Sequence, residues 1–285
     1  MSPYKSVPQR WLLTVCLIAA AGCARAATGP PSAEIDEAFK RLYNTDFQGA
    51  FVRLDRYIAA EPADPLGYGL RASAYLFQEL IRLGVLEGEF FADDKRIIDK
   101  KKLKPDPEVR RKLFQAIDEA KSRAKAALAK NPDDQNALFT MAVTNGIITD
   151  YTALVEKRQI SSLSTAKESN AYAQRLLKVN AQYYDAYLTT GFTEYLVGSL
   201  PFFVRWFVHF DDVKGNKNTG IQNLQTVAKS GHYLRPFARI LLAIVYLREK
   251  KPLETQKILT ELAVEFPENA LIRKELAKLN SQLKQ

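Results

Sequence analysis

The feature that most constrains this chain is a set of stretches in which small residues recur at helical spacing. The stretches are residues 46–62, 116–132, 165–181 and 251–267. In each stretch, small or apolar residues three or four positions apart share one face of a helix, and three of the four end in proline. Small side chains let a second helix approach closely, and a proline ends a helix. The pattern therefore predicts helices that pack in pairs.

A second type of helix lies beside each stretch, with its own small and aromatic residues at spacings of three and four. There is no convincing run in which β-branched residues alternate with polar ones, so strands are not expected. We predict an all-α fold, an antiparallel helix-pair solenoid. The residues that set the repeated pattern are Ala50, Pro62, Ala72, Tyr75, Ala120, Ala127, Pro132, Ala142, Gly191, Ala243, Tyr246 and Pro267.

The pattern resembles the tetratricopeptide repeat (TPR) family, and the match is best in LLAIVYLREKKPLETQKILTELAVEFPEN near the C-terminus. The chain departs from the family where Arg41 and Asn145 replace aromatic residues and where Ser169 and Thr255 replace alanine. The resemblance implies a superhelix whose concave groove binds a protein or peptide partner.

The resemblance also predicts how the chain is divided. We expect about five irregular repeats over residues 34–267, with insertions at 84–110 and 199–215. Residues 268–285 are expected to form a capping helix, in which Leu271, Leu276 and Leu279 are buried.

The N-terminus is typical of an export signal. Lys5 and Arg10 precede an apolar run of residues 11–21, which is too short to span a bilayer. We predict a signal peptide over residues 1–26 and a linker over residues 27–33. Cleavage before Ala27 gives a free periplasmic protein, whereas cleavage before Cys23 gives a lipid-anchored one, and both alternatives stay open.

The net charge of +9 arises from 41 Lys+Arg against 32 Asp+Glu, and it changes once the signal is removed. Residues 1–26 hold three basic residues and no acid. Much of the remaining excess falls in residues 93–112, where aromatic residues do not interleave with the lysines, so a nucleic-acid partner is not expected. This basic segment is either a patch for anionic lipid or an acidic partner, or a solvated loop, and the solvated loop is favoured.

A cluster of aromatic residues marks the second insertion. Their spacing places them on one face of a predicted helix over residues 201–210. Such a face either packs into the core or forms an exposed surface, which would bind a small ligand or dock on a membrane. The five residues are Phe202, Phe203, Trp206, Phe207 and Phe210.

Arg235 and Arg239 are the candidate partner-binding cations. They are four positions apart on one helix face, so both guanidinium groups can receive one carboxylate or peptide terminus. The alternative is that their aliphatic stems cover apolar surface while the charges face water.

We find no motif for catalysis, and therefore expect no enzyme activity. There is no phosphate-binding glycine loop and no nucleophile elbow. With two His and two Cys in the chain, neither a metal site nor a cofactor is expected. The first functional hypothesis is an envelope adaptor that binds a protein or peptide. The alternatives are a subunit that binds a small ligand or solute in an exported transport system, and a protein that docks on membranes through residues 201–210.

Overall fold

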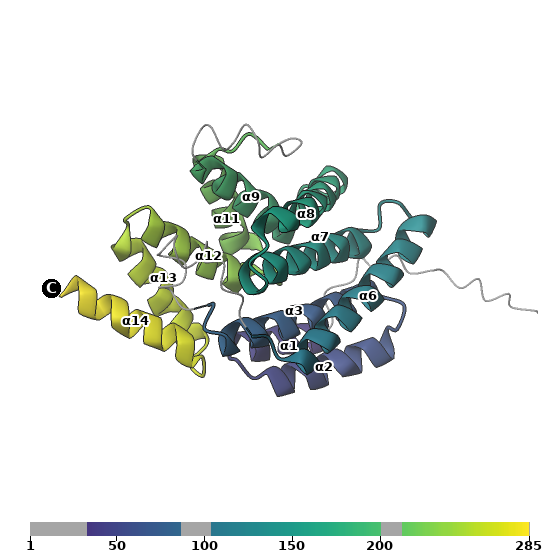
Figure 1. Ribbon diagram of the computed structural model, residues 1–285, viewed down its shortest axis with the longest axis horizontal. Helices are drawn as coiled ribbons and strands as arrows, with labels where there is room; N and C mark the ends of the chain where they lie inside the picture. Colours follow the sequence, from purple (N-terminus) through teal and green to yellow (C-terminus); the bar gives the residue numbers. More distant parts are fainter. Residues whose placement is uncertain (1–32, 87–103, 201–212, 285) are drawn as a thin grey trace, which may run out of the picture. The chain divides into compact units, whose positions relative to one another are not determined.

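The computed structural model describes residues 33–86, 104–200 and 213–284, and it contains eleven α-helices and no strand in these ranges (Figure 1). The chain divides into two compact units, residues 1–30 and 31–285, and every described helix belongs to the second. The expected all-α class is confirmed.

The described helices follow one another as five consecutive pairs and a final single helix (Figure 1). Each helix packs against the next along the chain, and turns of three or four residues between most neighbours make them antiparallel. This arrangement confirms a helix-pair solenoid. The pairs are α1 (Ala33–Tyr43) with α2 (Phe47–Ala60), α3 (Pro65–Arg82) with α6 (Pro107–Lys130), α7 (Gln135–Asp150) with α8 (Gln159–Val179), α9 (Tyr187–Ser199) with α11 (Lys217–Ser230), and α12 (Arg235–Arg248) with α13 (Pro252–Glu265); α14 (Ala270–Leu283) follows. Two short elements, η1 (Tyr151–Val155) and η2 (Tyr184–Ala186), complete the set.

Aspartates at helix starts explain where several helices begin. The side chains of Asp46, Asp64, Asp106 and Asp134 each accept a hydrogen bond from a backbone N–H in the first turn. These bonds satisfy donors that the helix itself leaves unpaired.

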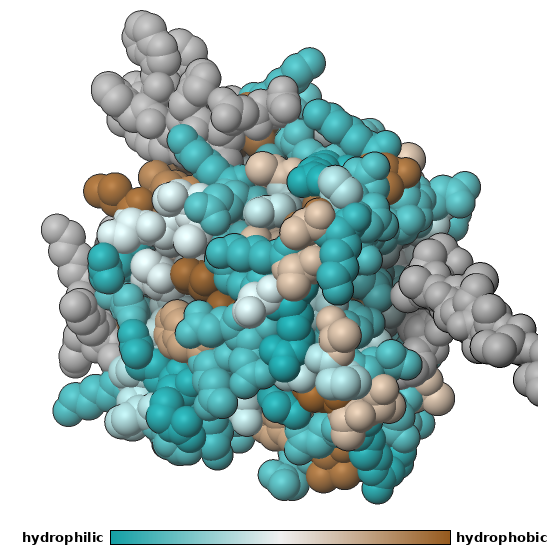
Figure 2. All heavy atoms as spheres, turned by 90° about the vertical axis from the view of Figure 1, so that its right-hand side faces the viewer, coloured by the Kyte–Doolittle hydropathy of each residue, from teal (hydrophilic) through white to brown (hydrophobic). Residues whose placement is uncertain are grey.

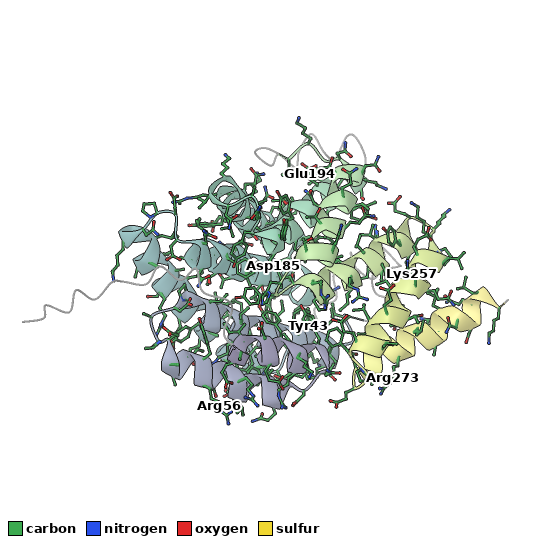
Figure 3. The ribbon with its side chains drawn as sticks, turned by 180° about the vertical axis from the view of Figure 1, so that it is seen from behind. Tyr43, Arg56, Asp185, Glu194, Lys257 and Arg273 are labelled. Carbon is green, nitrogen blue, oxygen red and sulfur yellow. The ribbon has the colours of Figure 1, made fainter. Side chains whose placement is uncertain are left out.

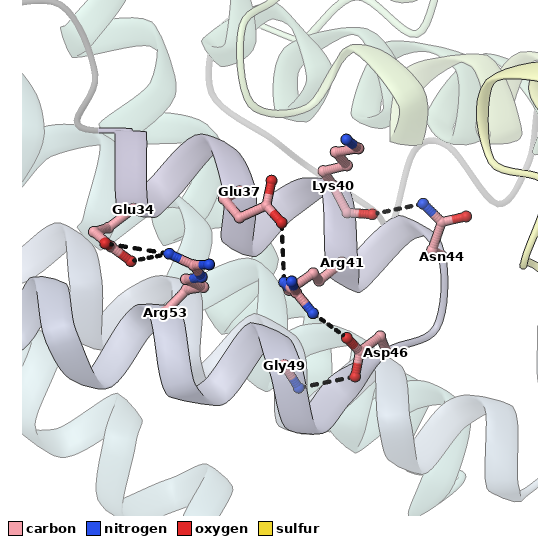
Figure 4. A network of polar contacts seen from close by, with 8 residues as sticks. All are labelled: Glu34, Glu37, Lys40, Arg41, Asn44, Asp46, Gly49 and Arg53. Carbon is pink, nitrogen blue, oxygen red and sulfur yellow. Dashed lines mark hydrogen bonds and ion pairs between the residues drawn. The ribbon is translucent and has the colours of Figure 1, made fainter.

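A network of polar contacts joins α1 to α2 (Figure 4). Arg41, which stands where the repeat pattern has an aromatic residue, pairs with Glu37 at 3.0 Å and with Asp46 at 2.7 Å. The backbone N–H of Gly49 and the Arg41 guanidinium hold the pKa of Asp46 below its ordinary value. Arg41 therefore stabilises the turn between α1 and α2 through ion pairs.

The helix crossings are built on small side chains, as the pattern predicts. Ala50, Ala72 and Ala120 are fully buried. At two crossings a hydroxyl replaces alanine and donates to the facing helix: Ser169 Oγ to the Ala142 carbonyl at 2.7 Å, and Thr255 Oγ1 to the Ala243 carbonyl at 3.1 Å. Both hydroxyl residues therefore fit the crossing: each adds a hydrogen bond to the facing helix and little bulk compared with alanine.

The final helix differs in detail from the expectation. Ile272 and Leu279 are its buried residues, whereas Leu271 and Leu276 are half-buried. The prediction for Leu271 was wrong. Because α14 packs mainly against α13, a narrower face of the helix is covered than was expected. On the face shown in Figure 2, hydrophilic side chains predominate and apolar ones are scattered.

One helical stretch of the described chain is both long and apolar. Within the described ranges, Gln135–Val155 (α7 with η1) is the one helical stretch long and apolar enough to cross a membrane. More than half of its most apolar window is buried inside the solenoid, as in the core helix of a globular domain.

The backbones of α9 and α11 approach each other closely at Gly191 and Gly220. A Cβ on Gly220 would lie 2.6 Å from the Tyr195 nitrogen and 2.7 Å from the Gly191 carbonyl oxygen. Both atoms belong to the backbone, so they can yield only if the two helices separate. By contrast, a Cβ on Gly146 in α7 would lie 3.5 Å from Ser169 Oγ, which is an ordinary contact.

This difference predicts opposite effects for the same substitution. We expect Gly220→Ala to lower the free energy of unfolding by about 1–3 kcal/mol, because the crossing becomes overpacked. We expect Gly146→Ala to raise it by about 0.5–1 kcal/mol, because alanine favours the helix and the space is available. Urea denaturation of the two variants checks this, and equal effects of one sign would refute the crossing geometry.

Candidate functional site

Aromatic side chains meet in the interior where the turns between successive pairs converge. The ring of Tyr233, just before α12, lies 5.3 Å from Phe39 of α1 and 6.0 Å from Phe139 of α7. Phe139 in turn lies 5.2 Å from Tyr183, just before η2. These four residues form an aromatic seam that connects elements far apart in the sequence. The aromatic seam therefore joins α1 and α7 to the turns before η2 and α12.

Asp185 holds the same region together with hydrogen bonds. Its buried carboxylate accepts three backbone N–H groups, from His232 at 3.1 Å, Tyr233 at 3.2 Å and Leu234 at 2.8 Å. Burial raises the pKa of Asp185, and the three donors act in the opposite direction. Figure 3 shows Asp185 and Tyr43 near the centre of the view. The carboxylate fixes the turn that leads into α12.

The first helix is joined to the last pairs by polar contacts. The Tyr43 hydroxyl donates to the Tyr233 carbonyl at 3.1 Å, and the side-chain amide of Asn269 donates to the Tyr43 carbonyl at 2.8 Å. Asp36 Oδ1 lies 2.8 Å from His232 Nε2. The solenoid thus closes on itself, which the sequence pattern did not predict.

The two candidate arginines converge on one carboxylate. Arg235 Nη2 donates to Glu265 Oε1 at 2.6 Å, and Arg239 Nη1 donates to the other oxygen, Oε2. Arg239 also pairs with Glu261 at 2.9 Å. The expected geometry, two guanidinium groups around one carboxylate, is therefore present, and Glu265 of α13 is the carboxylate that fills it.

The charges of this cluster differ in their access to solvent. The side chain of Arg239 is 13% exposed, whereas those of Arg235 and Glu265 are 45% and 30% exposed. Arg239 packs its stem against the protein, as the alternative interpretation expected, and still presents its guanidinium to two acids. We call these four residues, Arg235, Arg239, Glu261 and Glu265, the arginine–glutamate cluster.

The basic insertion at residues 84–110 is described only at its ends. Glu79, which is buried at the end of α3, accepts from Arg82 at 2.8 Å and from the backbone N–H of Asp106 at 2.7 Å. These bonds tie the residues before the insertion to the start of α6. Residues 87–103, including five of its lysines and arginines, lie outside the described residues.

The aromatic insertion is likewise described only at its ends. A Cβ on Gly198 would lie 2.7 Å from the carbonyl oxygen of Gly215, whose φ of +66° suits glycine. The Glu194 carboxylate accepts the backbone N–H groups of Lys214 at 3.1 Å and Asn216 at 2.8 Å. The chain on both sides of residues 201–212 therefore meets at one point. Phe202, Phe203, Trp206, Phe207 and Phe210 lie outside the described residues, as does Cys23.

The described interior offers little open volume near the N-terminal pairs. An apolar void of about 10 Å³ lies among α1, α2 and α3, and it is lined by residues such as Ala38, Leu54 and Leu70. This volume is about that of one water molecule, and its lining has no polar group to hold one.

Asp150, at the end of α7, gives the protein a pH-dependent stability. Burial raises the pKa of its carboxyl to about 7. Between about pH 4 and pH 7 the folded protein binds more protons than the unfolded chain, so stability falls as the pH rises through this window. We expect Asp150→Asn to remove that part of the slope, since an amide does not titrate. The check is the difference in unfolding free energy between the variant and the wild type from pH 4 to pH 8; a difference that does not change with pH would contradict the assignment.

Comparison with protein-family models finds no match to the chain, and comparison with curated proteins finds none either. Among the described residues, no group of three or more His, Cys, Asp and Glu side chains is placed to hold a metal ion.

The sequence prediction for Arg235 and Arg239 did not include their acidic partners, Glu261 and Glu265. Glu261 and Glu265 are four positions apart on α13, and this spacing mirrors that of Arg235 and Arg239 on α12. The matching spacing on two successive helices was an available signal. No comparable signal marks Asp185, because its role depends on a turn that lies 47 residues away.

Proposed function

We propose that the protein is an exported, non-catalytic TPR scaffold of the cell envelope that binds a protein or peptide partner. The helix-pair solenoid supports this proposal, since such stacks are mostly used for binding. The small-residue crossings, with Ala50, Ala72 and Ala120 fully buried, support the repeat assignment. The export signal read from residues 1–26 supports the location.

The arginine–glutamate cluster is the observation that carries the proposal. Two guanidinium groups already converge on the two oxygens of Glu265. A carboxylate of a partner, either a side chain or a C-terminus, presents the same two oxygens and fits the same pair of donors. We propose that such a carboxylate binds here by replacing Glu265.

The exposure of the cluster fits an exchange of this kind. Arg235 and Glu265 are accessible, whereas the more buried Arg239 retains Glu261 as a second partner. The exchange therefore does not leave Arg239 without an acid. The proposed contact lies on α12 and α13, which carry the four residues of the arginine–glutamate cluster.

Crosslinked capture from the native envelope tests the proposal. The full chain serves as bait, so that its own N-terminal signal directs it to the envelope. We expect Arg235→Ala combined with Arg239→Ala to reduce the captured partner by about tenfold or more, because charge-assisted hydrogen bonds contribute about 1.5–3 kcal/mol each. Circular dichroism of the same variant shows whether the helices persist.

Glu265→Gln is the matched control for this experiment. It weakens the same internal ion pairs but keeps both arginines, so we expect it to retain or increase capture. Loss of capture in both variants would show that the cluster acts only through the fold, and unchanged capture in the double arginine variant would refute the proposed site.

A further inference from the structure

Two turns of the last helix pair hold the end of the first helix. Residues 231–234 precede α12 and residues 266–269 follow α13, so both turns lie at the same end of this antiparallel pair. Tyr43, the last residue of α1, contacts both of them. Its hydroxyl donates to the Tyr233 carbonyl at 3.1 Å, and its own carbonyl accepts from the side-chain amide of Asn269 at 2.8 Å. We call residues 231–234 the first closing turn and residues 266–269 the second closing turn.

Buried groups carry most of this contact. Tyr43 and Asn269 are both buried, and the ring of Tyr43 lies 5.4 Å from that of Phe266 in the second closing turn. The pair between Asp36 and His232 is about half exposed, with side chains 50% and 48% accessible, and exposed pairs of this kind contribute little to stability. The closure of the solenoid therefore depends mainly on Tyr43 and on the position of the two closing turns relative to each other.

One ion pair joins the two closing turns. Arg235 is the first residue of α12 and Glu265 is the last residue of α13, so each of them adjoins one closing turn. Arg235 Nη2 lies 2.6 Å from Glu265 Oε1. We call this contact the closing ion pair. Together with Tyr43 it completes a ring of contacts that runs from α1 through the first closing turn, the closing ion pair and the second closing turn back to α1.

The two closing turns are held in different ways. The Asp185 carboxylate accepts three backbone N–H groups of the first closing turn, which fixes that turn to η2. The second closing turn instead contacts the end of α1, where the N–H of Glu268 donates to Asn44 Oδ1 at 3.1 Å. Phe266 directly follows Glu265 in the chain. A displacement of Glu265 therefore reaches the second closing turn, and through it the contact with Tyr43.

We propose that the closing ion pair keeps the solenoid closed on α1, and that a carboxylate which replaces Glu265 loosens this closure. The inference rests on the carboxylate recognition proposed above and adds a conformational change to it. When a partner's carboxylate binds Arg235 and Arg239, Glu265 loses both guanidinium groups, and the second closing turn loses its connection to the first. Because α12 and α13 still pack together, the contact with α1 weakens while the pair itself persists.

Thermodynamic linkage makes this coupling reciprocal. If binding of a carboxylate weakens the hold on Tyr43, then weakening the hold on Tyr43 strengthens binding of the carboxylate by the same factor. Couplings between two sites commonly change an affinity by about fivefold to 150-fold. A cluster that binds a carboxylate without affecting α1 would show no such effect.

Amide hydrogen exchange of the full chain, without any partner, tests the closing ion pair. We expect Glu265→Gln to raise the exchange rates of residues 42–46 and 266–269 by about fivefold or more, because the second closing turn is then free to move away from α1. Mass spectrometry of peptides from these segments measures the rates. Glu261→Gln is the matched control. It removes the same charge from α13 but pairs only with Arg239, so we expect wild-type rates in both segments.

The reciprocal test uses Tyr43→Phe, which removes only the hydroxyl that donates to the first closing turn. In crosslinked capture from the native envelope, we expect this variant to raise the amount of captured partner by about threefold or more. Tyr68→Phe is its control, because it removes a hydroxyl that donates to the Pro62 carbonyl at 3.3 Å, within the N-terminal pairs. We expect Tyr68→Phe to capture as the wild type does.

The results distinguish this inference from the proposed function. Unchanged exchange in Glu265→Gln would overturn the role of the closing ion pair, even if capture still depends on Arg235 and Arg239. Equal acceleration in Glu261→Gln would overturn it too, since the effect would then follow from lost charge. Unchanged or lower capture by Tyr43→Phe would overturn the coupling. Capture that is independent of both arginines would refute the proposed function and the loosening by a carboxylate, whereas faster exchange in Glu265→Gln alone would still support the closing ion pair.

Discussion

Replacement of Phe139 by alanine is expected to lower the free energy of unfolding by about 3–5 kcal/mol. Phe139 is 1% exposed, and its ring contacts Tyr183 and Tyr233 on two different turns. Its removal leaves a cavity where α7 meets the turns before η2 and before α12. Because the turn before α12 also contacts α1, through Tyr233 and Phe39, the surroundings cannot close the cavity without moving the first helix.

Chemical denaturation monitored by circular dichroism measures this loss. Phe139→Leu is the control, since it keeps most of the apolar volume and should cost clearly less. A loss below about 1 kcal/mol for Phe139→Ala would mean that the aromatic seam contributes little to the cohesion of the solenoid.

The second large effect is expected at Asp185. Its replacement by alanine leaves three backbone donors, on His232, Tyr233 and Leu234, without their acceptor. A buried donor without a partner costs about 1–3 kcal/mol, so we expect a total loss of about 3 kcal/mol or more. The turn into α12 should also become more mobile, which faster amide exchange at residues 232–234 would show.

Asparagine at position 185 separates hydrogen bonding from packing. Both carboxylate oxygens of Asp185 accept N–H groups, so the amide nitrogen of Asn would face a donor. We therefore expect Asp185→Asn to cost at least half as much as Asp185→Ala, although it preserves the size of the side chain. A stability equal to that of the wild type would show that the residue acts only by filling space.

The helical fold could be predicted from the sequence because the faces and ends of each helix depend on residues only a few positions apart. The alanines at positions 50, 72 and 120 and the prolines that end the repeated stretches determine helix faces and boundaries over a few residues. The hydroxyls of Ser169 and Thr255 looked like departures from the pattern, yet both are compatible with the same crossing.

The closure of the solenoid could not be predicted in this way. The contacts of Asp36 with His232 and of Tyr43 with Tyr233 join residues about 190 positions apart. No periodicity relates such residues, because their proximity depends on the summed rotation of all the intervening pairs. The π-helical turn η1 also depends on tertiary packing, since Tyr151 packs edge-on against Phe114 of α6.

The candidate site was predicted in part. The spacing of Arg235 and Arg239 indicated that two guanidinium groups would converge, and they do. The acid between them was expected to be the carboxylate or peptide terminus of a partner. Glu265 supplies that acid because α13 packs against α12 with its own acids at the same spacing. The aromatic residues between Phe202 and Phe210 lie outside the described residues, and their role stays a prediction.

The most direct test of the proposed function is the affinity of the captured partner for three forms of the protein. The forms are the wild type, the Arg235→Ala and Arg239→Ala double variant, and Glu265→Gln, each measured at two ionic strengths. We expect the double variant to bind about tenfold or more weakly, with little remaining salt dependence, and Glu265→Gln to bind at least as tightly as the wild type. Equal affinity of the double variant and the wild type would contradict the proposed carboxylate site.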